Sequence, residues 1–112
     1  MTGDIILEVI GCYGMQFRHA DKTLNRIDEE ADFDGGFSTS VVKKFRMRMQ
    51  SIRAAANEND LREMKSNHFE KLKGDRKGEY SIRLNDQFRL TFQIEKAGDG
   101  NQIVVLGIED YH

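Results

Sequence analysis

The sequence of 112 residues contains one cysteine, no proline, no tryptophan and no long apolar run. Because Cys12 is the only cysteine, a disulfide framework is excluded, and a reducing, cytoplasmic environment is expected. No stretch approaches the roughly 18 apolar residues of a membrane helix, so we expect no membrane association. The apolar stretch 5–10 is interrupted by Glu8 and lacks a basic lead-in, which is not the pattern of a secretory signal.

Histidine is scarce as well, with three residues in the chain. Neither these histidines nor Cys12 show metal-ligand spacing, so neither a metal nor another cofactor is expected. We read His19 as a surface residue and His68 as a loop residue. Internal repeats and low-complexity segments are also missing, and the length fits one small domain.

The charged residues are distributed unevenly, although the net charge is only −2. Residues 1–42 carry 3 basic and 8 acidic side chains, residues 43–93 carry 13 and 7, and residues 94–112 carry 1 and 4. The basic middle segment predicts a face that binds a polyanion. The alternative is that some of these residues only solvate a helix, namely Lys43, Lys44, Arg46 and Arg48.

Amphipathic patterns predict helices in the first half of the chain. Asp21 is a suitable N-cap for a short helix that would bury Leu24 and Ile27. A longer helix is expected to begin after Ser38 or Thr39. Its apolar residues recur at spacings of three and four, which places on one buried stripe Val42, Phe45, Met49, Ile52 and Ala56.

The chain after this helix is expected to change gradually from helix to strand. We expect fraying through residues 57–60 and a short helical piece at 61–65. From residue 69 onward, apolar and polar residues alternate, which predicts strands at 80–84, 88–94 and 102–109 with a hairpin loop at 98–101. Helices followed by a meander predict an α+β fold, with the helices packed on one face of a small antiparallel sheet.

The register of the first hairpin follows from its apolar pattern. Closing Leu84 onto Phe88 keeps one face apolar and places Arg83 directly opposite Arg89. Like charges in that position destabilise a sheet, so the pair suggests a bound anion. The alternative is that both arginines extend into solvent or pair with nearby acidic residues.

The chain closes with Glu109, Asp110, Tyr111 and His112, directly after an apolar strand. If that strand stays extended, Asp110 and His112 share one face of the sheet and Tyr111 takes the other. An imidazole can move protons near neutral pH.

Further positive charge comes from a loop with two glycines, which carries Lys71, Lys73, Arg76 and Lys77. Arginine binds a phosphate in a bidentate manner, and lysine acts as a point charge. With the imidazole, these groups suffice to cleave RNA through attack of its own 2′-hydroxyl, and this chemistry requires no metal.

Three runs of residues carry a resemblance to a known family. They are LKGDRKG at 72–78, YSIRLNDQFRLTF at 80–92 and EDYH at 109–112. Together they closely resemble the HigB toxins of bacterial toxin–antitoxin systems, which belong to the RelE/ParE superfamily. The resemblance is strong from residue 69 to 112 and looser through the helices. It predicts a single RelE-like domain over residues 15–112, preceded by an extension or additional strand over residues 1–14.

The resemblance implies a ribosome-dependent mRNA endonuclease, an mRNA interferase that cuts the codon in the ribosomal A site. It assigns Lys73, Arg83 and Arg89 to phosphate binding or transition-state stabilisation. His112 would be the general acid or base, and Asp110 would orient it or share that role. Tyr111 would position the base or shape the pocket.

The resemblance also implies partners and competing functions. The expected partners are a HigA-like helix-turn-helix antitoxin, the ribosome with its mRNA, and operator DNA reached through the antitoxin complex. One alternative is a ParE-like inhibitor of DNA gyrase, which does not need a titrating tail. Another is a non-toxic member that only binds its antitoxin, because family members are usually more basic than this chain.

Overall fold

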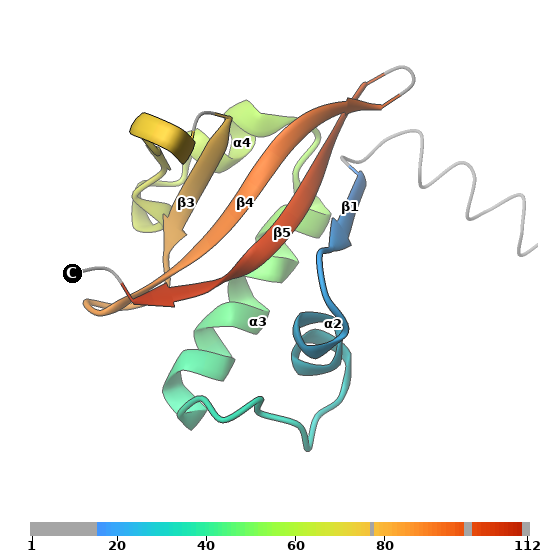
Figure 1. The fold of residues 1–112 in the computed structure, drawn as a ribbon, viewed down its shortest axis with the longest axis vertical. Helices are drawn as coiled ribbons and strands as arrows, with labels where there is room; N and C mark the ends of the chain where they lie inside the picture. Colours follow the sequence, from blue (N-terminus) through green and yellow to red (C-terminus); the bar gives the residue numbers. More distant parts are fainter. Residues whose placement is uncertain (1–15, 77, 98–99, 111–112) are drawn as a thin grey trace, which may run out of the picture.

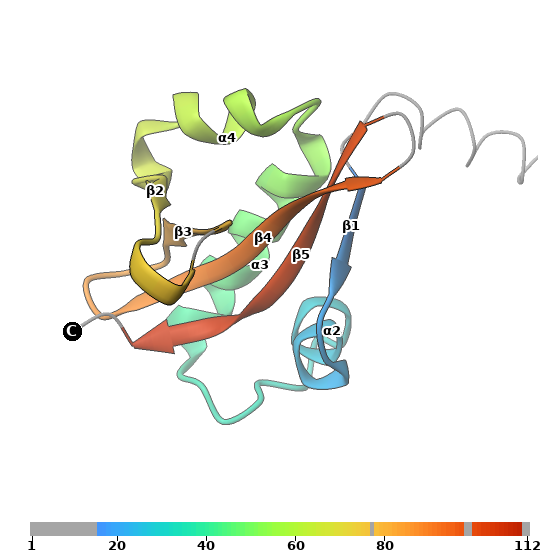
Figure 2. The same cartoon turned by 45° about the horizontal axis from the view of Figure 1, so that its top comes forward.

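The computed structural model describes residues 16–76, 78–97 and 100–110. The chain runs through β1 (Gln16–His19), α2 (Lys22–Glu29), α3 (Thr39–Ala54), α4 (Glu58–Glu63), the 3₁₀ turn η1 (Lys65–Asn67), β2 (Glu70–Lys71), the 3₁₀ turn η2 (Gly74–Arg76), β3 (Glu79–Arg83), β4 (Phe88–Ala97) and β5 (Gly100–Asp110). Figures 1 and 2 show α2 and α3 on one side of a twisted sheet. The predicted α+β class is confirmed. In the described part of the chain, no helix is long and apolar enough to span a membrane.

The sheet of the described residues has five strands in the order β1-β5-β4-β3-β2. The antiparallel meander is confirmed for β2 to β5. At the other edge, β1 pairs with β5 in parallel, with Phe17 opposite Ile103. The sheet is therefore mixed rather than wholly antiparallel, and β5 lies inside it, as its apolar sequence predicts. The sequence expectation for residues 1–14 lies outside the described residues.

The two principal helices begin at the predicted N-caps. Asp21 Oδ1 accepts a hydrogen bond from the Leu24 amide at 2.9 Å, and Ser38 Oγ accepts one from the Val41 amide at 3.3 Å. These bonds satisfy amides that have no partner inside the helix. The predicted buried residues of α2, Leu24 and Ile27, are confirmed.

The apolar stripe of α3 packs on the sheet, with one correction at its end. Four of the five predicted stripe residues are buried, namely Val42, Phe45, Met49 and Ile52. Ala56 is exposed and Ala55 is buried instead, because the helix ends at Ala54 and the chain then extends. The stripe contacts the inner face of the sheet, including Ile82, Leu90, Phe92, Ile103 and Val105.

The region after α3 is more ordered than the sequence suggested. Asn57 is an N-cap whose Oδ1 accepts hydrogen bonds from the amides of Asn59 and Asp60, at 3.0 and 3.3 Å. The helix α4 therefore begins at Glu58, where fraying was expected, and ends at Glu63. An amide-bearing cap outweighs the weak apolar pattern of this segment.

The turn between α2 and α3 depends on two glycines with positive φ. Gly35 has φ 63° and Gly36 has φ 90°, and a Cβ atom at Gly35 would lie 2.6 Å from Ile27 Cδ1. A Cβ atom at Gly36 would meet nothing within 4 Å. We expect Gly36→Ala to lower the free energy of unfolding by about 1–2 kcal/mol through backbone strain alone. Gly35→Ala should lower it by about 1–3 kcal/mol more, because Ile27 is fully buried and its side chain would have to shift within a packed core.

Urea denaturation of the two variants measures this difference. Equal losses for both substitutions would show that the contact with Ile27 is unimportant.

Candidate functional site

The face of the sheet that points away from the helices carries the predicted arginines. Arg83 lies opposite Arg89 in the β3–β4 register, as predicted, and Ser81 lies opposite Thr91. Side chains of directly paired residues share a face, so these four belong to the same surface. We call this surface the open face.

Arg89 does not extend outward as a free guanidinium. The residue is only 5% exposed. Its Nε donates to Ser81 Oγ at 2.7 Å, and its Nη2 donates to the His68 carbonyl. The anion expected between Arg83 and Arg89 is therefore not needed to relieve their repulsion. Arg89 turns into the protein, where its Nη1 also lies 4.0 Å from Glu70 Oε1, so pairing with nearby acidic residues, the alternative from the sequence, is observed.

Arg83 keeps its side chain accessible, with 37% exposed. It pairs with Asp86 in the β3–β4 turn, and the Asp86 side chain is 94% exposed. Ion pairs at such exposed positions are weak and exchange readily. The Arg83 guanidinium is thus held at the surface but can be taken up by another anion.

The same turn contacts the end of β5. Gln87, the residue after Asp86, donates a hydrogen bond from Nε2 to Asp110 Oδ2 at 3.0 Å. The turn therefore brings Arg83 and Asp110 to the same end of the sheet, although they come from strands that are not adjacent.

A β-bulge changes which residue of β5 faces the open side. Thr91 pairs with Gly107 and Phe92 with Val105, so Leu106 is an extra residue on β5. Beyond the bulge, Glu109 pairs with Arg89 and Asp110 pairs with Phe88. A bulge shifts alternation by one residue. Consequently Glu109 belongs to the open face. Asp110 has the register of the core side, but at the end of the strand it is exposed and also reaches the pocket described below.

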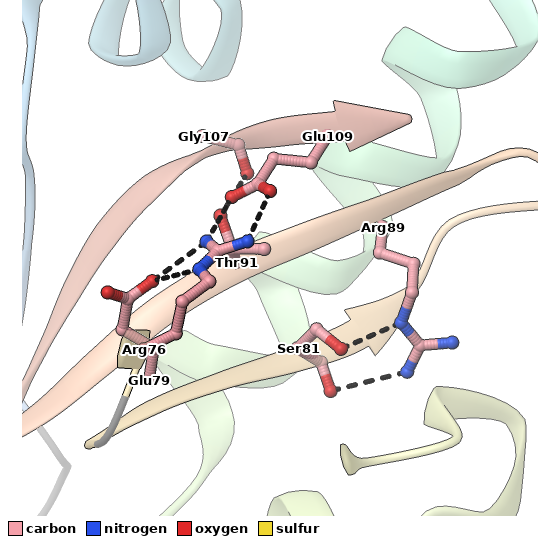
Figure 3. Close-up of polar contacts among 7 residues, drawn as sticks. All are labelled: Arg76, Glu79, Ser81, Arg89, Thr91, Gly107 and Glu109. Atoms are coloured by element: carbon pink, nitrogen blue, oxygen red, sulfur yellow. Dashed lines mark hydrogen bonds and ion pairs between the residues drawn. The ribbon is translucent and has the colours of Figure 1, made fainter. Parts of the chain in front are cut away.

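Arg76, predicted to bind RNA, is engaged by two carboxylates above the open face (Figure 3). Its Nε and Nη2 donate to Glu79 Oε1 at 2.9 and 2.8 Å. Its Nη1 and Nη2 donate to Glu109 Oε1 and Oε2 at 2.6 and 2.5 Å. Hydrogen bonds from Arg76 lower the pKa of Glu109, against the opposing effect of partial burial, and a hydrogen bond from Thr91 adds to the lowering. These carboxylates in turn raise the pKa of Arg76.

Arg76 and Glu109 also line a pocket of about 500 Å³ on the open face. It is lined by Leu72, Arg76, Ser81, Arg89, Thr91, Glu109 and Asp110. Leu72 is the apolar residue of this lining, and the other six residues are polar or charged. Among the described residues, no group of three or more histidines, cysteines or carboxylates could hold a metal ion.

The other predicted site residues are divided between the surface and the undescribed segments. Lys71 and Lys73 are exposed around the loop that precedes η2. Lys77, Tyr111 and His112 lie outside the described residues. The two lysines are therefore accessible, and the roles expected for Lys77, Tyr111 and His112 concern residues outside the described part of the chain.

The basic residues of α3 do not form one solvated face. Arg46 Nε donates to the Ile27 carbonyl at 2.8 Å, and its Nη2 donates to the Glu30 carbonyl at 2.7 Å. Arg48 is only 7% exposed, burial lowers its pKa, and its Nε donates to the Arg83 carbonyl at 2.9 Å. Arg48 thus fixes the backbone beneath Arg83, while Lys43 and Lys44 are exposed.

His19 is not a surface residue, contrary to the expectation from the sequence. Its side chain is 4% exposed, and Nε2 is 2.9 Å from Asp28 Oδ2. Asp28, itself 2% exposed, also pairs with Arg53. These three residues join β1, α2 and α3.

Sequence reasoning missed the two acidic partners of Arg76. Neither Glu79 nor Glu109 was assigned a role, and Asp110 was the one carboxylate predicted at the site. Gly107 inside the strand was the available signal, since an isolated glycine in a strand indicates a bulge. A bulge at that position would have moved Glu109 to the face of Arg89.

The comparisons with known proteins identify the class to which this fold and site belong. A family model described as "RelE-like toxin of type II toxin-antitoxin system HigB" matches residues 16–112. The chain therefore belongs to the HigB family of RelE-like toxins of type II toxin–antitoxin systems.

Two relatives and two solved structures illustrate the likeness. Toxin HigB-1 of Vibrio cholerae is 35% identical over 79 residues, which are 70% of this chain and 83% of that protein. An uncharacterised protein of Haemophilus influenzae is 33% identical over 75 residues, which are 67% and 74% of the two chains. The YoeB/ParE toxin from Agrobacterium tumefaciens has TM-score 0.55 and 15% identity, covering 88% of this chain and all (100%) of that one. The YoeB–YefM complex from Staphylococcus aureus has TM-score 0.56 and 22% identity, covering 88% and 97%. The two structures support the fold.

Proposed function

We propose that this toxin is a ribosome-dependent endoribonuclease that cuts mRNA in the ribosomal A site and so stops translation in the cytoplasm. A HigA-like helix-turn-helix antitoxin would neutralise it, and the complex would bind operator DNA through the antitoxin. The observation that supports this proposal best is the 84–87 turn. Within this turn, Asp86 forms an ion pair with the accessible guanidinium of Arg83, and Gln87 donates a hydrogen bond to Asp110.

The proposed reaction is attack of the RNA 2′-hydroxyl on the adjacent phosphate. One group takes the 2′-hydroxyl proton, cations stabilise the crowded phosphate, and an acid protonates the leaving 5′-oxygen. We assign Arg83 to the phosphate, since its guanidinium is accessible and its pairing with Asp86 is exposed. Lys73, which is exposed in the neighbouring loop, would add a second cation.

The proton transfers are assigned to the end of the chain. His112 would act as the general acid or base, with Asp110 orienting it or sharing the role and Tyr111 positioning the base. Arg89 is a positioning residue in this proposal rather than a phosphate ligand, because its guanidinium is bonded to Ser81 and the His68 carbonyl.

The variant His112→Ala should lose toxicity and reduce mRNA cleavage at least about 100-fold, the scale of general acid–base catalysis. Its thermal midpoint should equal that of the wild type, because a terminal side chain contributes little to the core. His68→Asn is the matched control, since it removes an exposed imidazole and asparagine tolerates the positive φ of 45° at that position. If cells expressing His112→Ala stop growing as fast as with the wild type, the tail is not catalytic.

Pulse-labelling after induction distinguishes the three function classes. Loss of protein synthesis with cuts at defined codon positions supports the endoribonuclease. Loss of DNA supercoiling with intact mRNA would identify a gyrase inhibitor. A chain that binds its antitoxin and changes neither process would be a non-toxic member of the family.

A further inference from the structure

The Arg76 guanidinium already has an anion in the geometry that a phosphate would adopt. Glu109 accepts two parallel hydrogen bonds from Nη1 and Nη2, at 2.6 and 2.5 Å. This bidentate arrangement is the one by which arginine recognises either a carboxylate or a phosphate. Glu109 therefore occupies the place of a phosphate on Arg76.

The charges around Arg76 determine how strongly the pocket attracts an anion. Arg76 carries one positive charge, and Glu79 and Glu109 carry two negative charges, so the three together are negative. Arg89 also lines the pocket, but its Nε and Nη2 are bonded to Ser81 and to the His68 carbonyl, and the Glu70 carboxylate, 4.0 Å from its Nη1, offsets its charge. A phosphate that enters the unliganded pocket thus meets a cation whose charge is already compensated.

The two carboxylates on Arg76 differ in how easily they can leave. The Glu109 side chain is 40% exposed and the Glu79 side chain is 19% exposed. A half-exposed carboxylate can turn into water with little loss of solvation, whereas a more buried one keeps its partner. Glu79 would therefore continue to hold Arg76 while Glu109 moves away.

We propose that Glu109 is a specificity-determining residue, which an RNA phosphate displaces from Arg76 when the substrate binds. This inference rests on the proposed function. An RNA chain that also contacts Arg83 and Lys73 gains enough binding energy to displace Glu109, whereas an isolated phosphate does not. Glu109 thereby suppresses binding of free nucleotides and short RNA. The toxin then binds tightly only to RNA that contacts several of its cationic side chains at once.

The test measures binding of a fluorescein-labelled, 2′-O-methylated single-stranded RNA, which cannot be cleaved, by fluorescence anisotropy at constant salt. Glu109→Gln should bind this RNA about tenfold more tightly than the wild type, because the resident charge is removed. Glu95→Gln is the matched control. It makes the same change in net charge on an exposed residue that pairs with Arg18, outside the pocket. We expect Glu95→Gln to change the dissociation constant less than twofold.

The double variant Glu109→Gln/Arg76→Ala shows whether the gain passes through Arg76. The gain should disappear in this variant. Equal affinities for Glu109→Gln, Glu95→Gln and wild type would overturn the proposal, as would a gain that persists without Arg76.

A second probe separates this inference from the proposed function. The Arg76 Nε–H resonance is followed by NMR while inorganic phosphate is added. A response in Glu109→Gln and none in the wild type supports the exchange, even if no variant cuts mRNA and the proposed function fails. The same response in both proteins would overturn the exchange, even if the wild type inhibits translation.

Discussion

Arg89→Ala is expected to lower the free energy of unfolding by about 2–4 kcal/mol, which is a large part of the stability of a small domain. Alanine would leave the buried Ser81 hydroxyl and the His68 carbonyl without the donor that they have in the native protein. It would also leave a space where the guanidinium packs, since the residue is only 5% exposed. Urea denaturation monitored by circular dichroism measures the loss.

Arg83→Ala is the matched control for that experiment, because Arg83 is the arginine that lies directly opposite Arg89 in the β3–β4 register. Its ion pair with Asp86 is exposed, so stability should change by less than about 1 kcal/mol. Toxicity should nevertheless fall, because Arg83 is assigned to the phosphate. The structural role of Arg89 would be contradicted by an Arg89→Ala protein that keeps its urea midpoint and loses only activity.

Asp28→Ala is expected to cost about 2–3 kcal/mol of stability, because it leaves two partners without their acceptor. His19 Nε2 and Arg53 both bond to Asp28 Oδ2, and His19 Nδ1 is already buried without a partner among the described residues. The loss should loosen β1 from α2 and α3, which hydrogen exchange of the β1 amides can measure. Glu29→Ala, at the exposed next position on α2, serves as the control and should be close to neutral.

The contribution of Asp28 should also depend on pH. Burial alone would raise the pKa of Asp28, but hydrogen bonds from His19 and Arg53 outweigh burial and hold it below the ordinary value of 3.8. A carboxyl group whose pKa is lower in the folded than in the unfolded state stabilises the fold above its unfolded pKa. That stabilisation is lost as the pH falls through the lower, folded pKa. The difference in stability between wild type and Asp28→Asn should therefore shrink in acid, and an unchanged difference at low pH would contradict this account.

Local patterns predicted the elements and the first hairpin well. The caps at Asp21 and Ser38 are short-range signals, and they are confirmed. The placement of Arg83 opposite Arg89 follows from the alternation of apolar and polar residues within 10 residues on either side of a turn. This placement is confirmed as well. In both cases the interacting residues are neighbours in sequence, so a pattern is enough to locate them.

Contacts between distant segments were not predictable in the same way. The burial of His19 depends on Asp28 and on the packing of β1 beside α2, which no periodicity expresses. The direction of Arg89 depends on Ser81 and on a carbonyl in the left-handed turn at His68. Similarly, the contact between Arg76 and Glu109 requires one extra residue in β5, which shifts the alternation of that strand. Side-chain direction at the candidate site is thus a tertiary property rather than a local one.

The parallel pairing of β1 with β5 has a consequence for how this protein folds during synthesis. Phe17 pairs with Ile103, so 86 positions separate the two partners (103 minus 17). Contacts of such long range form late, because the chain entropy lost on closing the loop is recovered only when both strands are present. On the ribosome, β1 cannot complete the sheet until translation has passed residue 105 and that segment has left the exit tunnel. A nascent toxin chain therefore lacks its finished sheet until residues 102–105, the partners of β1, have emerged.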